Sequence, residues 1–235
     1  MLCGEARSPA YEAVHTRWVV FVADEYWIIA DELRGSRPHR YDLRFHLPAD
    51  AEGRTTVTTD DVNSVVRAPG LALVFAPSRT PRIEAGWVAP EYGVKLAAPV
   101  VSVAVDGVAA TRFFTLVVPA SSSDSPPLLR VHSDGTTESH VLEITGVGPA
   151  GCDRDSVVWN AARAPFELGG FRGRAAAAWI RESPTGQILT FTACDVVEAT
   201  CPALGKTVLP RRPRPARWVR WDAAQDLVEV AAEDP

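Results

Sequence analysis

The chain has 235 residues, of which 46% are hydrophobic and 23% charged, with a formal net charge of −5 and a pI of about 5.6. These values are ordinary for a folded globular protein, and the acidic balance argues against nucleic acid or an anionic membrane as a partner. No stretch approaches the ~18 apolar residues of a membrane span, so the sequence predicts no transmembrane helix. An acidic polymer could bind only through a local basic cleft.

The N-terminal sequence and the cysteine content indicate in which cellular compartment the protein could reside. Residues 1–9 lack the apolar segment of a secretory signal. Either the protein stays in the cytoplasm, or the chain is a piece whose targeting segment lies elsewhere. Four cysteines are too few for a disulfide scaffold and show no C-x-x-C spacing. Cys194 and Cys201 flank an expected loop and either form a disulfide or remain two free thiols.

Residues 11–48 are predicted to form three antiparallel strands. The β-branched and aromatic runs 18–22 and 26–30 are separated by a short polar break, and residues 31–38 contain the Gly, Ser and Pro typical of a turn. Residues 39–47 alternate between apolar and polar side chains, which predicts a strand with one buried face. Its apolar face carries Tyr41, Leu43, Phe45 and Leu47. Its other face carries a polar row that is either solvated or part of a cleft; depending on local register, the row contains His39, Arg40 or Asp42, Arg44 and His46.

Short strands continue along the rest of the chain. Residues 65–75 predict a hairpin around Pro69 and Gly70, and residues 100–118 predict another that turns at Asp106 and Gly107. Further strands are expected after the Ser- and Pro-rich segment 119–127, including one over 175–180 and a last hairpin over 218–230.

This spacing of strands and turns predicts the fold class. We expect an all-β protein, a large antiparallel two-sheet β-sandwich, possibly with a small β-extension. The segment 119–127 is the strongest boundary candidate. It would separate residues 1–120, with the main sandwich strands, from residues 121–235, with the remaining strands or the extension.

Two motifs resemble one known family. The first runs from the His-x-Arg of His15 and Arg17 through residues 26–31 to residues 39–48, and the second covers residues 84–95. In this order and spacing they resemble the β-sandwich of the heparinase II/III-like polysaccharide lyases, clearly over about residues 11–120. The resemblance implies β-elimination on a uronic-acid-containing glycan, such as a heparan-type glycosaminoglycan or alginate.

The resemblance also implies a partner. In this family a helical toroid, N-terminal to the sandwich, supplies a tyrosine acid/base and a group that neutralises charge, and the sandwich contributes a histidine. The sequence contains no toroid-like helical segment. We therefore expect the chain to be inactive unless a toroid domain or partner chain accompanies it. The family suggests a periplasmic or secreted location.

His15 and Arg17 are the candidate catalytic residues that the resemblance implies. Histidine suits proton transfer because its unperturbed pKa lies near neutral pH. Arg17 could hold a substrate carboxylate by two parallel hydrogen bonds. The structural alternatives are a histidine that makes one backbone hydrogen bond at the start of a strand, and a solvated strand arginine.

A zinc ion is the only cofactor that the resemblance suggests. Some family members bind zinc in the sandwich, and His15, Asp31 and His46 could supply its nitrogen and oxygen ligands, with His39 as a substitute for His46. These side chains converge only if they share one face of the sheet, and a one-residue change of register would reverse that face. The alternative for Asp31 is a turn residue.

Candidate substrate-binding residues lie in the second motif. Trp87 and Tyr92 offer rings that could stack on sugars, and Lys95 could contact an acidic group. Trp87 is expected in a loop-like segment, where it either packs the loop or lines a glycan surface. The other function class is a non-catalytic carbohydrate-binding or structural β-sandwich module.

Overall fold

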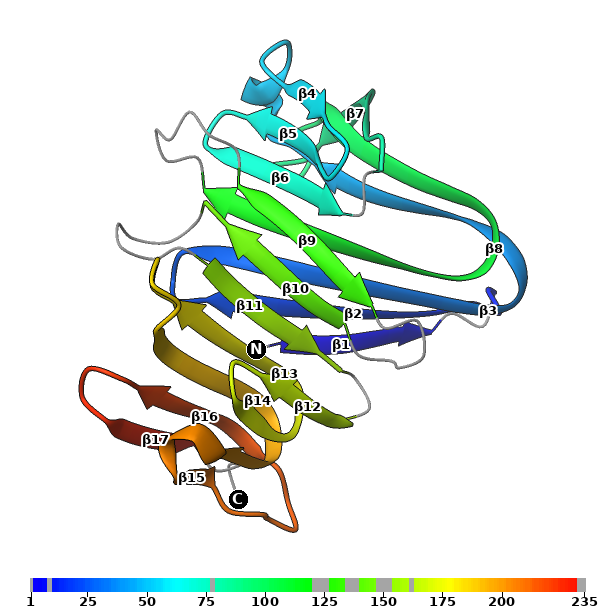
Figure 1. Cartoon of the computed structure of the whole chain (residues 1–235). Helices are drawn as coiled ribbons and strands as arrows, with labels where there is room; N and C mark the ends of the chain where they lie inside the picture. The colour runs from blue at the N-terminus through cyan, green and yellow to red at the C-terminus, as the bar shows by residue number, and fades with distance from the viewer. Residues whose placement is uncertain are drawn as a thin grey trace. The chain divides into compact units, whose positions relative to one another are not determined.

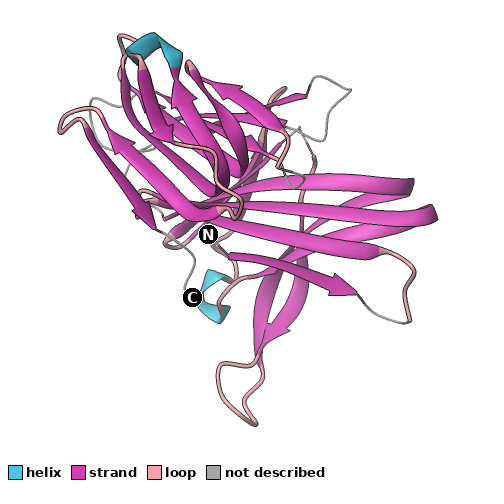
Figure 2. Cartoon of the chain, turned by 90° about the horizontal axis from the view of Figure 1, so that it is seen from below, coloured by secondary structure: helices cyan, strands magenta, loops and turns pink. Residues whose placement is uncertain are grey.

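The structure is a computed structural model that describes residues 2–7, 10–76, 79–119, 127–133, 140–146, 154–160 and 163–231, without the side chains of residues 2–7 and 133. Its residues group into two compact units, 1–129 and 130–235. Strands dominate both units, and the helical segments of the described chain are short 3-10 turns, η1 (Ala49–Ala51) and η2 (Pro202–Leu204) (Figure 2). The predicted all-β class with two antiparallel sheets is confirmed.

The first unit holds a sheet whose described strands run in the order β1-β2-β3-β8-β6-β5-β4, with β7 paired to part of β8 (Figure 1). All of these pairs are antiparallel. The strands are β1 (Leu2–Arg7), β2 (Val14–Val22), β3 (Tyr26–His46), β4 (Thr56–Thr59), β5 (Ser64–Ala68), β6 (Leu71–Ala76), β7 (Arg82–Val88) and β8 (Leu96–Pro119).

Two long strands, β3 and β8, organise this unit and correct two of the predicted turns. Residues 31–38 do not separate two strands but lie within β3, and Asp106 and Gly107 lie within β8. The two strands pair with each other over most of their length and curve side by side in Figure 1. The turn-forming residues instead make register shifts between Arg34 and Tyr41. Gly107, at a φ of +70°, takes a backbone conformation that glycine adopts readily.

One hydrophobic core cluster of the first unit lies on one face of these strands. Tyr41, Leu43 and Leu47 are buried, as the alternation in this segment predicts, and Phe45 is partly buried. They pack in one cluster with side chains from β5, β6 and β8, including Val66, Leu73, Phe75, Val101, Val103 and Phe113. The predicted hairpin over residues 65–75 is confirmed, because Ala68 pairs with Leu71 across it.

The second unit is built on a sheet whose described strands run in the order β17-β16-β14-β13-β11-β10-β9, with β12 paired to β13 and β15 to β14. Its aromatic core includes Phe171 and Phe191, whose rings stack with centroids 4.1 Å apart. The strands are β9 (Leu128–Ser133), which begins at the end of the first unit, β10 (His140–Thr145), β11 (Arg154–Trp159), β12 (Pro165–Leu168), β13 (Phe171–Glu182), β14 (Ile188–Cys201), β15 (Lys206–Leu209), β16 (Ala216–Asp222) and β17 (Leu227–Ala231).

Other sequence predictions can be checked in the second half of the chain. The strand over 175–180 and the hairpin over 218–230 are confirmed. Cys194 and Cys201 are free thiols, and burial raises the pKa of the Cys194 thiol. Most of the segment 119–127 lies outside the described residues. Among the described helical segments, none has the length and apolar character needed to cross a membrane.

Candidate functional site

His15, Arg17 and Asp31 form one hydrogen-bonded group at the β2–β3 pair. The Arg17 Nε donates to Asp31 Oδ1 at 2.7 Å, and its Nη2 donates to Oδ2 at 3.1 Å. The His15 Nε2 lies 2.5 Å from the same Oδ1. The structure therefore brings together three of the residues that the sequence singled out, with the carboxylate between the two nitrogen-bearing side chains.

Strand register explains this convergence. Arg17 pairs directly with Asp31 across β2 and β3, and His15 pairs with Leu33. Directly opposed residues of an antiparallel pair share a face, and residues two apart on one strand share it as well. His15, Arg17 and Asp31 therefore project from the same side of the sheet, which the sequence alone did not establish.

Burial makes the Asp31 carboxylate dependent on these partners. Only 1% of Asp31 is exposed, whereas the His15 and Arg17 side chains are about 40% exposed. A buried carboxylate without partners would be costly, and a bidentate guanidinium is among its strongest partners. With the carboxylate as acceptor, the proton of the neutral His15 ring is placed on Nε2, so Nδ1 carries the lone pair. The group thus presents a partly exposed histidine in a defined orientation.

The proposed metal ligands are not assembled. His46 lies at the far end of β3, fifteen residues beyond Asp31 and, at about 3.3 Å per residue, tens of ångströms along the strand. Its Nδ1 is 3.1 Å from the Trp87 carbonyl oxygen, and His39 lies 3.5 Å from Glu12. Within the described ranges, no group of three or more His, Cys, Asp or Glu side chains is placed to hold a metal ion.

The donor set at Asp31 also does not fit zinc. The Arg17 guanidinium already occupies both carboxylate oxygens, and its positive charge would repel a bound dication. The aspartate is therefore neutralised by a residue of this chain.

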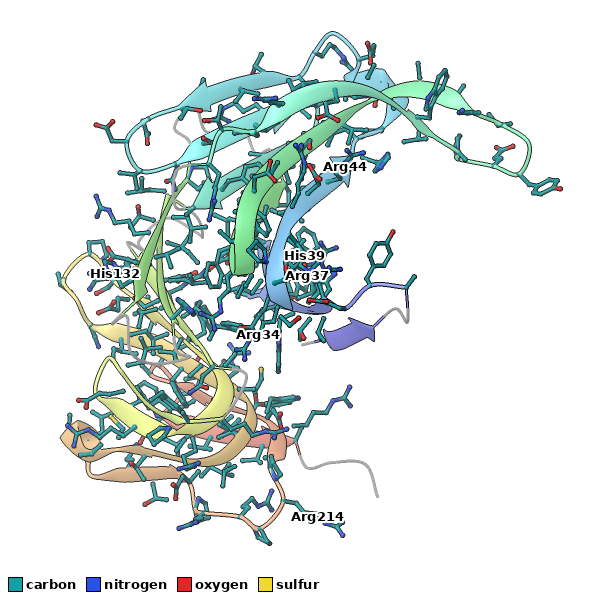
Figure 3. All side chains as sticks on the ribbon, turned by 90° about the vertical axis from the view of Figure 1, so that its right-hand side faces the viewer. Arg34, Arg37, His39, Arg44, His132 and Arg214 are labelled. Atoms are coloured by element: carbon teal, nitrogen blue, oxygen red, sulfur yellow. The ribbon has the colours of Figure 1, made fainter. Side chains whose placement is uncertain are left out.

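A pocket of about 540 Å³ opens beside His15. One wall is the segment 10–13, which leads into β2. The other is formed by β3 and includes Arg40 together with Arg37 and His39, which are labelled in Figure 3. The sequence did not single out Tyr11, Glu12 or Arg37. The only feature of the sequence that pointed to this pocket was the polar row that begins at His39, which could be interpreted from the sequence alone as either solvated or part of a cleft. The lining residues are Ala10, Tyr11, Glu12, Ala13, His15, Leu33, Arg37, His39, Arg40 and Tyr41.

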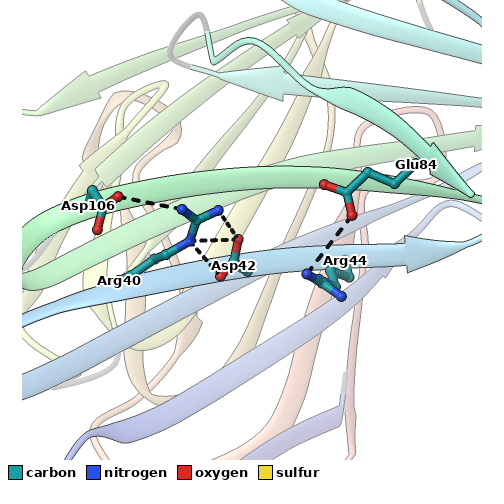
Figure 4. Close-up of polar contacts among 5 residues, drawn as sticks. All are labelled: Arg40, Asp42, Arg44, Glu84 and Asp106. Carbon is teal, nitrogen blue, oxygen red and sulfur yellow. Dashed lines mark hydrogen bonds and ion pairs between the residues drawn. The ribbon is translucent and has the colours of Figure 1, made fainter. Parts of the chain in front are cut away.

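Most of that polar row forms ion pairs at the surface. Arg40 holds Asp42 with contacts of 3.1 to 3.3 Å and lies 3.6 Å from Asp106, and Arg44 lies 3.9 Å from Glu84 (Figure 4). The hydrogen bond from Arg40 lowers the pKa of Asp42. Only the beginning of the row, at His39 and Arg40, lines the pocket.

The second motif forms an exposed hairpin. Trp87 lies in strand β7, where it pairs with Ala97, and not in the loop that the sequence suggested. It is 55% exposed, Tyr92 is fully exposed, and the Lys95 Nζ lies 4.2 Å from the Trp87 ring centroid. This cation–π contact orients a partly exposed indole beside a positive charge.

The geometry thus defines an all-β fold with an Asp-oriented histidine beside a pocket. Residues 5–137 match the family model described as "Heparinase II/III-like, C-terminal", and the chain belongs to that family. It is 29% identical over 147 residues to a heparin-sulfate lyase of Bacteroides stercoris, an alignment that covers 58% of this chain and 22% of that protein.

Solved structures of heparinases share a likeness with the chain. A heparinase III gene product has 20% identity and a TM-score of 0.49 over 65% of this chain and 24% of that one. The heparan sulfate lyase HepC of Pedobacter heparinus has 18% identity and a TM-score of 0.47 over 59% and 23%. The chain thus spans about a quarter or less of the length of these relatives.

Proposed function

We propose that this chain forms the histidine-bearing side of the active site of a polysaccharide lyase that acts on uronic-acid-containing glycans. The observation that carries this proposal is the His15–Asp31–Arg17 group, in which a partly exposed histidine is oriented by a buried carboxylate. Family membership and the likeness to a heparin-sulfate lyase support the substrate class. Heparan-type glycans and alginate are both acidic polymers of this class.

The reaction is a β-elimination. A base removes the proton from the carbon next to the uronate carboxylate, the bond from the adjoining carbon to the glycosidic oxygen breaks, and a carbon–carbon double bond forms. The departing oxygen takes a proton from an acid. His15 Nδ1 exchanges a proton with the substrate, and Asp31 fixes the orientation of the ring through Nε2.

Arg17 is a positioning residue in this scheme. Its Nε and Nη2 are engaged by Asp31, so we assign it to that carboxylate rather than to the carboxylate of the substrate. The remaining acid/base and charge-neutralising groups would come from a helical toroid domain or partner chain, as in the family that the sequence resembles.

The isolated chain provides a first test. We expect residues 1–235 alone to show little or no turnover of alginate or heparan-type substrates, measured as new ultraviolet absorbance from the unsaturated uronate, because catalytic groups that act as a unit lose most of the rate when some are absent. Adding a toroid partner in trans should restore turnover. Robust turnover by the unaccompanied chain would contradict the proposed division of the site.

A second candidate function, glycan binding without catalysis, rests on the β7–β8 hairpin. Trp87 and Tyr92 are exposed, and Lys95 lies over the Trp87 ring, an arrangement suited to a sugar ring that carries a negative charge. Trp87→Ala should then weaken binding of an acidic oligosaccharide without changing stability. If that variant binds as well as the unsubstituted chain, the hairpin is not a glycan site.

A further inference from the structure

The pocket beside His15 has one wall made of a short segment outside the sheet. Residues 10–13 precede β2, and Tyr11 on this segment is 73% exposed although it lines the pocket. The pocket volume of about 540 Å³ lies in the range typical of small-molecule sites. A large ring exposed on the wall of such a pocket is available to a ligand, because it is not used to fill the core.

Glu12 attaches this segment to β3. Its Oε1 accepts a hydrogen bond from the Ser36 backbone N–H at 3.1 Å and a second from the Ser36 hydroxyl. The Arg37 Nε lies 3.3 Å from Oε2, and the His39 Nε2 lies 3.5 Å from Oε1. Four groups from one short stretch of β3 thus converge on the carboxylate of the residue next to Tyr11.

The irregular part of β3 makes these contacts available. Pairing with β8 is interrupted between Arg34 and His39, which leaves the Ser36 N–H for Glu12. A Cβ atom on Gly35 would come within 2.7 Å of His39 Cδ2 and 3.1 Å of the Tyr41 hydroxyl. The glycine therefore lets His39 lie against the backbone, where it both lines the pocket and faces Glu12.

We infer that Tyr11 is a sugar-stacking residue of the pocket beside His15, and that Glu12 is the positioning residue that holds it there. The ligand class is an acidic oligosaccharide. The ring would cover the apolar face of one sugar, and Arg37 and Arg40 on the facing wall, each also paired with a carboxylate of this chain, offer further guanidinium N–H groups to its polar substituents. This inference rests on the proposed function and identifies where the sugar next to His15 would lie.

The test is a calorimetric or NMR titration of the full chain with heparan-type and alginate-type tetrasaccharides. We expect Tyr11→Ala to weaken binding about fivefold or more, and Tyr11→Phe to stay within about twofold, because the ring supplies the contact. Glu12→Gln should also weaken binding, as Tyr11→Ala does. Phe21→Ala removes an exposed ring elsewhere on the sheet, stacked on Trp27, and should leave the affinity unchanged.

The outcomes separate this inference from the proposed function. Unchanged affinity in Tyr11→Ala, or no binding of either tetrasaccharide at millimolar concentration, would overturn the role of Tyr11. If Trp87→Ala loses binding and Tyr11→Ala keeps it, the role of Tyr11 is also overturned, and the β7–β8 hairpin is favoured as the glycan-binding site. The proposed function is judged separately, by turnover with a toroid partner, which this titration does not measure.

Discussion

Arg17 and Asp31 are direct cross-strand partners, and the guanidinium of the first binds both carboxylate oxygens of the second. This pair explains how a nearly fully buried aspartate can lie in the sheet. It also fixes the acceptor for His15, whose Nε2 contacts the same carboxylate. The orientation of the candidate catalytic histidine therefore depends on a residue that we do not expect to touch the substrate.

Arg17→Ala should lower the free energy of unfolding by about 1–3 kcal/mol, because it leaves the Asp31 carboxylate without its bidentate donor. Urea denaturation measures the change. Arg44→Ala is the matched control, since its exposed pair with Glu84 at 3.9 Å should contribute no more than about 0.5 kcal/mol. Equal effects of the two substitutions would show that the Arg17–Asp31 pair behaves like an ordinary surface ion pair.

Zinc should not bind at Asp31 in the unsubstituted chain. We expect neither a chelator nor added zinc to shift Tm through this site, because the guanidinium occupies both carboxylate oxygens. Arg17→His would place a second imidazole beside His15 and Asp31, and it should create a zinc-dependent rise in Tm. A rise that saturates at one zinc ion per unsubstituted chain, and is lost in Asp31→Asn, would contradict this account.

The Glu12 contact should respond to acid. Hydrogen bonding from the Ser36 hydroxyl lowers the pKa of Glu12 below its usual value near 4.5, with Arg37 and His39 also facing it. A lowered pKa in the folded state means that the contact stabilises the fold above the usual pKa and is lost as the pH falls through the lowered value. Glu12→Gln should therefore unfold at a lower temperature than the unsubstituted chain at neutral pH, and the two unfolding temperatures should converge in acid.

Thermal unfolding at pH values from about 7 down to 3 measures this difference. Glu91→Gln, an exposed carboxylate near Tyr92, is the control and should give a parallel curve. A constant gap between Glu12→Gln and the unsubstituted chain at all pH values would show that the carboxylate charge is not what holds residues 10–13.

The second unit contains a more deeply buried ion pair. Arg181 and Asp155 are 6% and 2% exposed, and two hydrogen bonds of 2.8 and 2.7 Å join them. Arg181→Met should lower the free energy of unfolding by about 3–5 kcal/mol, because it leaves a buried carboxylate without its cation. Arg220→Met, at an exposed pair with a 3.8 Å contact, should change it little. If the two variants shift the urea denaturation midpoint by similar amounts, the buried Arg181–Asp155 pair does not contribute more than the exposed one.

The fold was largely predictable from alternation and turn residues, except where long-range pairing overrode local signals. Asp106 and Gly107 are a good hairpin signal, yet each half of β8 pairs with β3 rather than with the other half. The positive φ of Gly107 is used within the strand instead of at a hairpin tip. Local residue preference did not reveal this, because the competing pairing partner lies about 70 residues earlier in the chain.

The site was only partly predictable, because it too depends on the pairing of strands that are distant in the sequence. The His-x-Arg motif singled out His15 and Arg17, but their meeting with Asp31 depended on a register that the sequence left open. The wall at Tyr11 and Glu12 was missed because its contacts join an exposed segment to an irregular stretch of β3 that the sequence suggested was a turn.

The central claim is that His15 takes part in β-elimination. The most direct measurement is the turnover of a uronate-containing glycan by the chain together with a toroid partner, before and after His15→Ala. We predict a loss of about a hundredfold or more in His15→Ala with the fold retained. His132→Ala, which removes an exposed histidine of β9, should keep full turnover. Unchanged turnover in His15→Ala would contradict the account and leave His15 as a structural residue of β2.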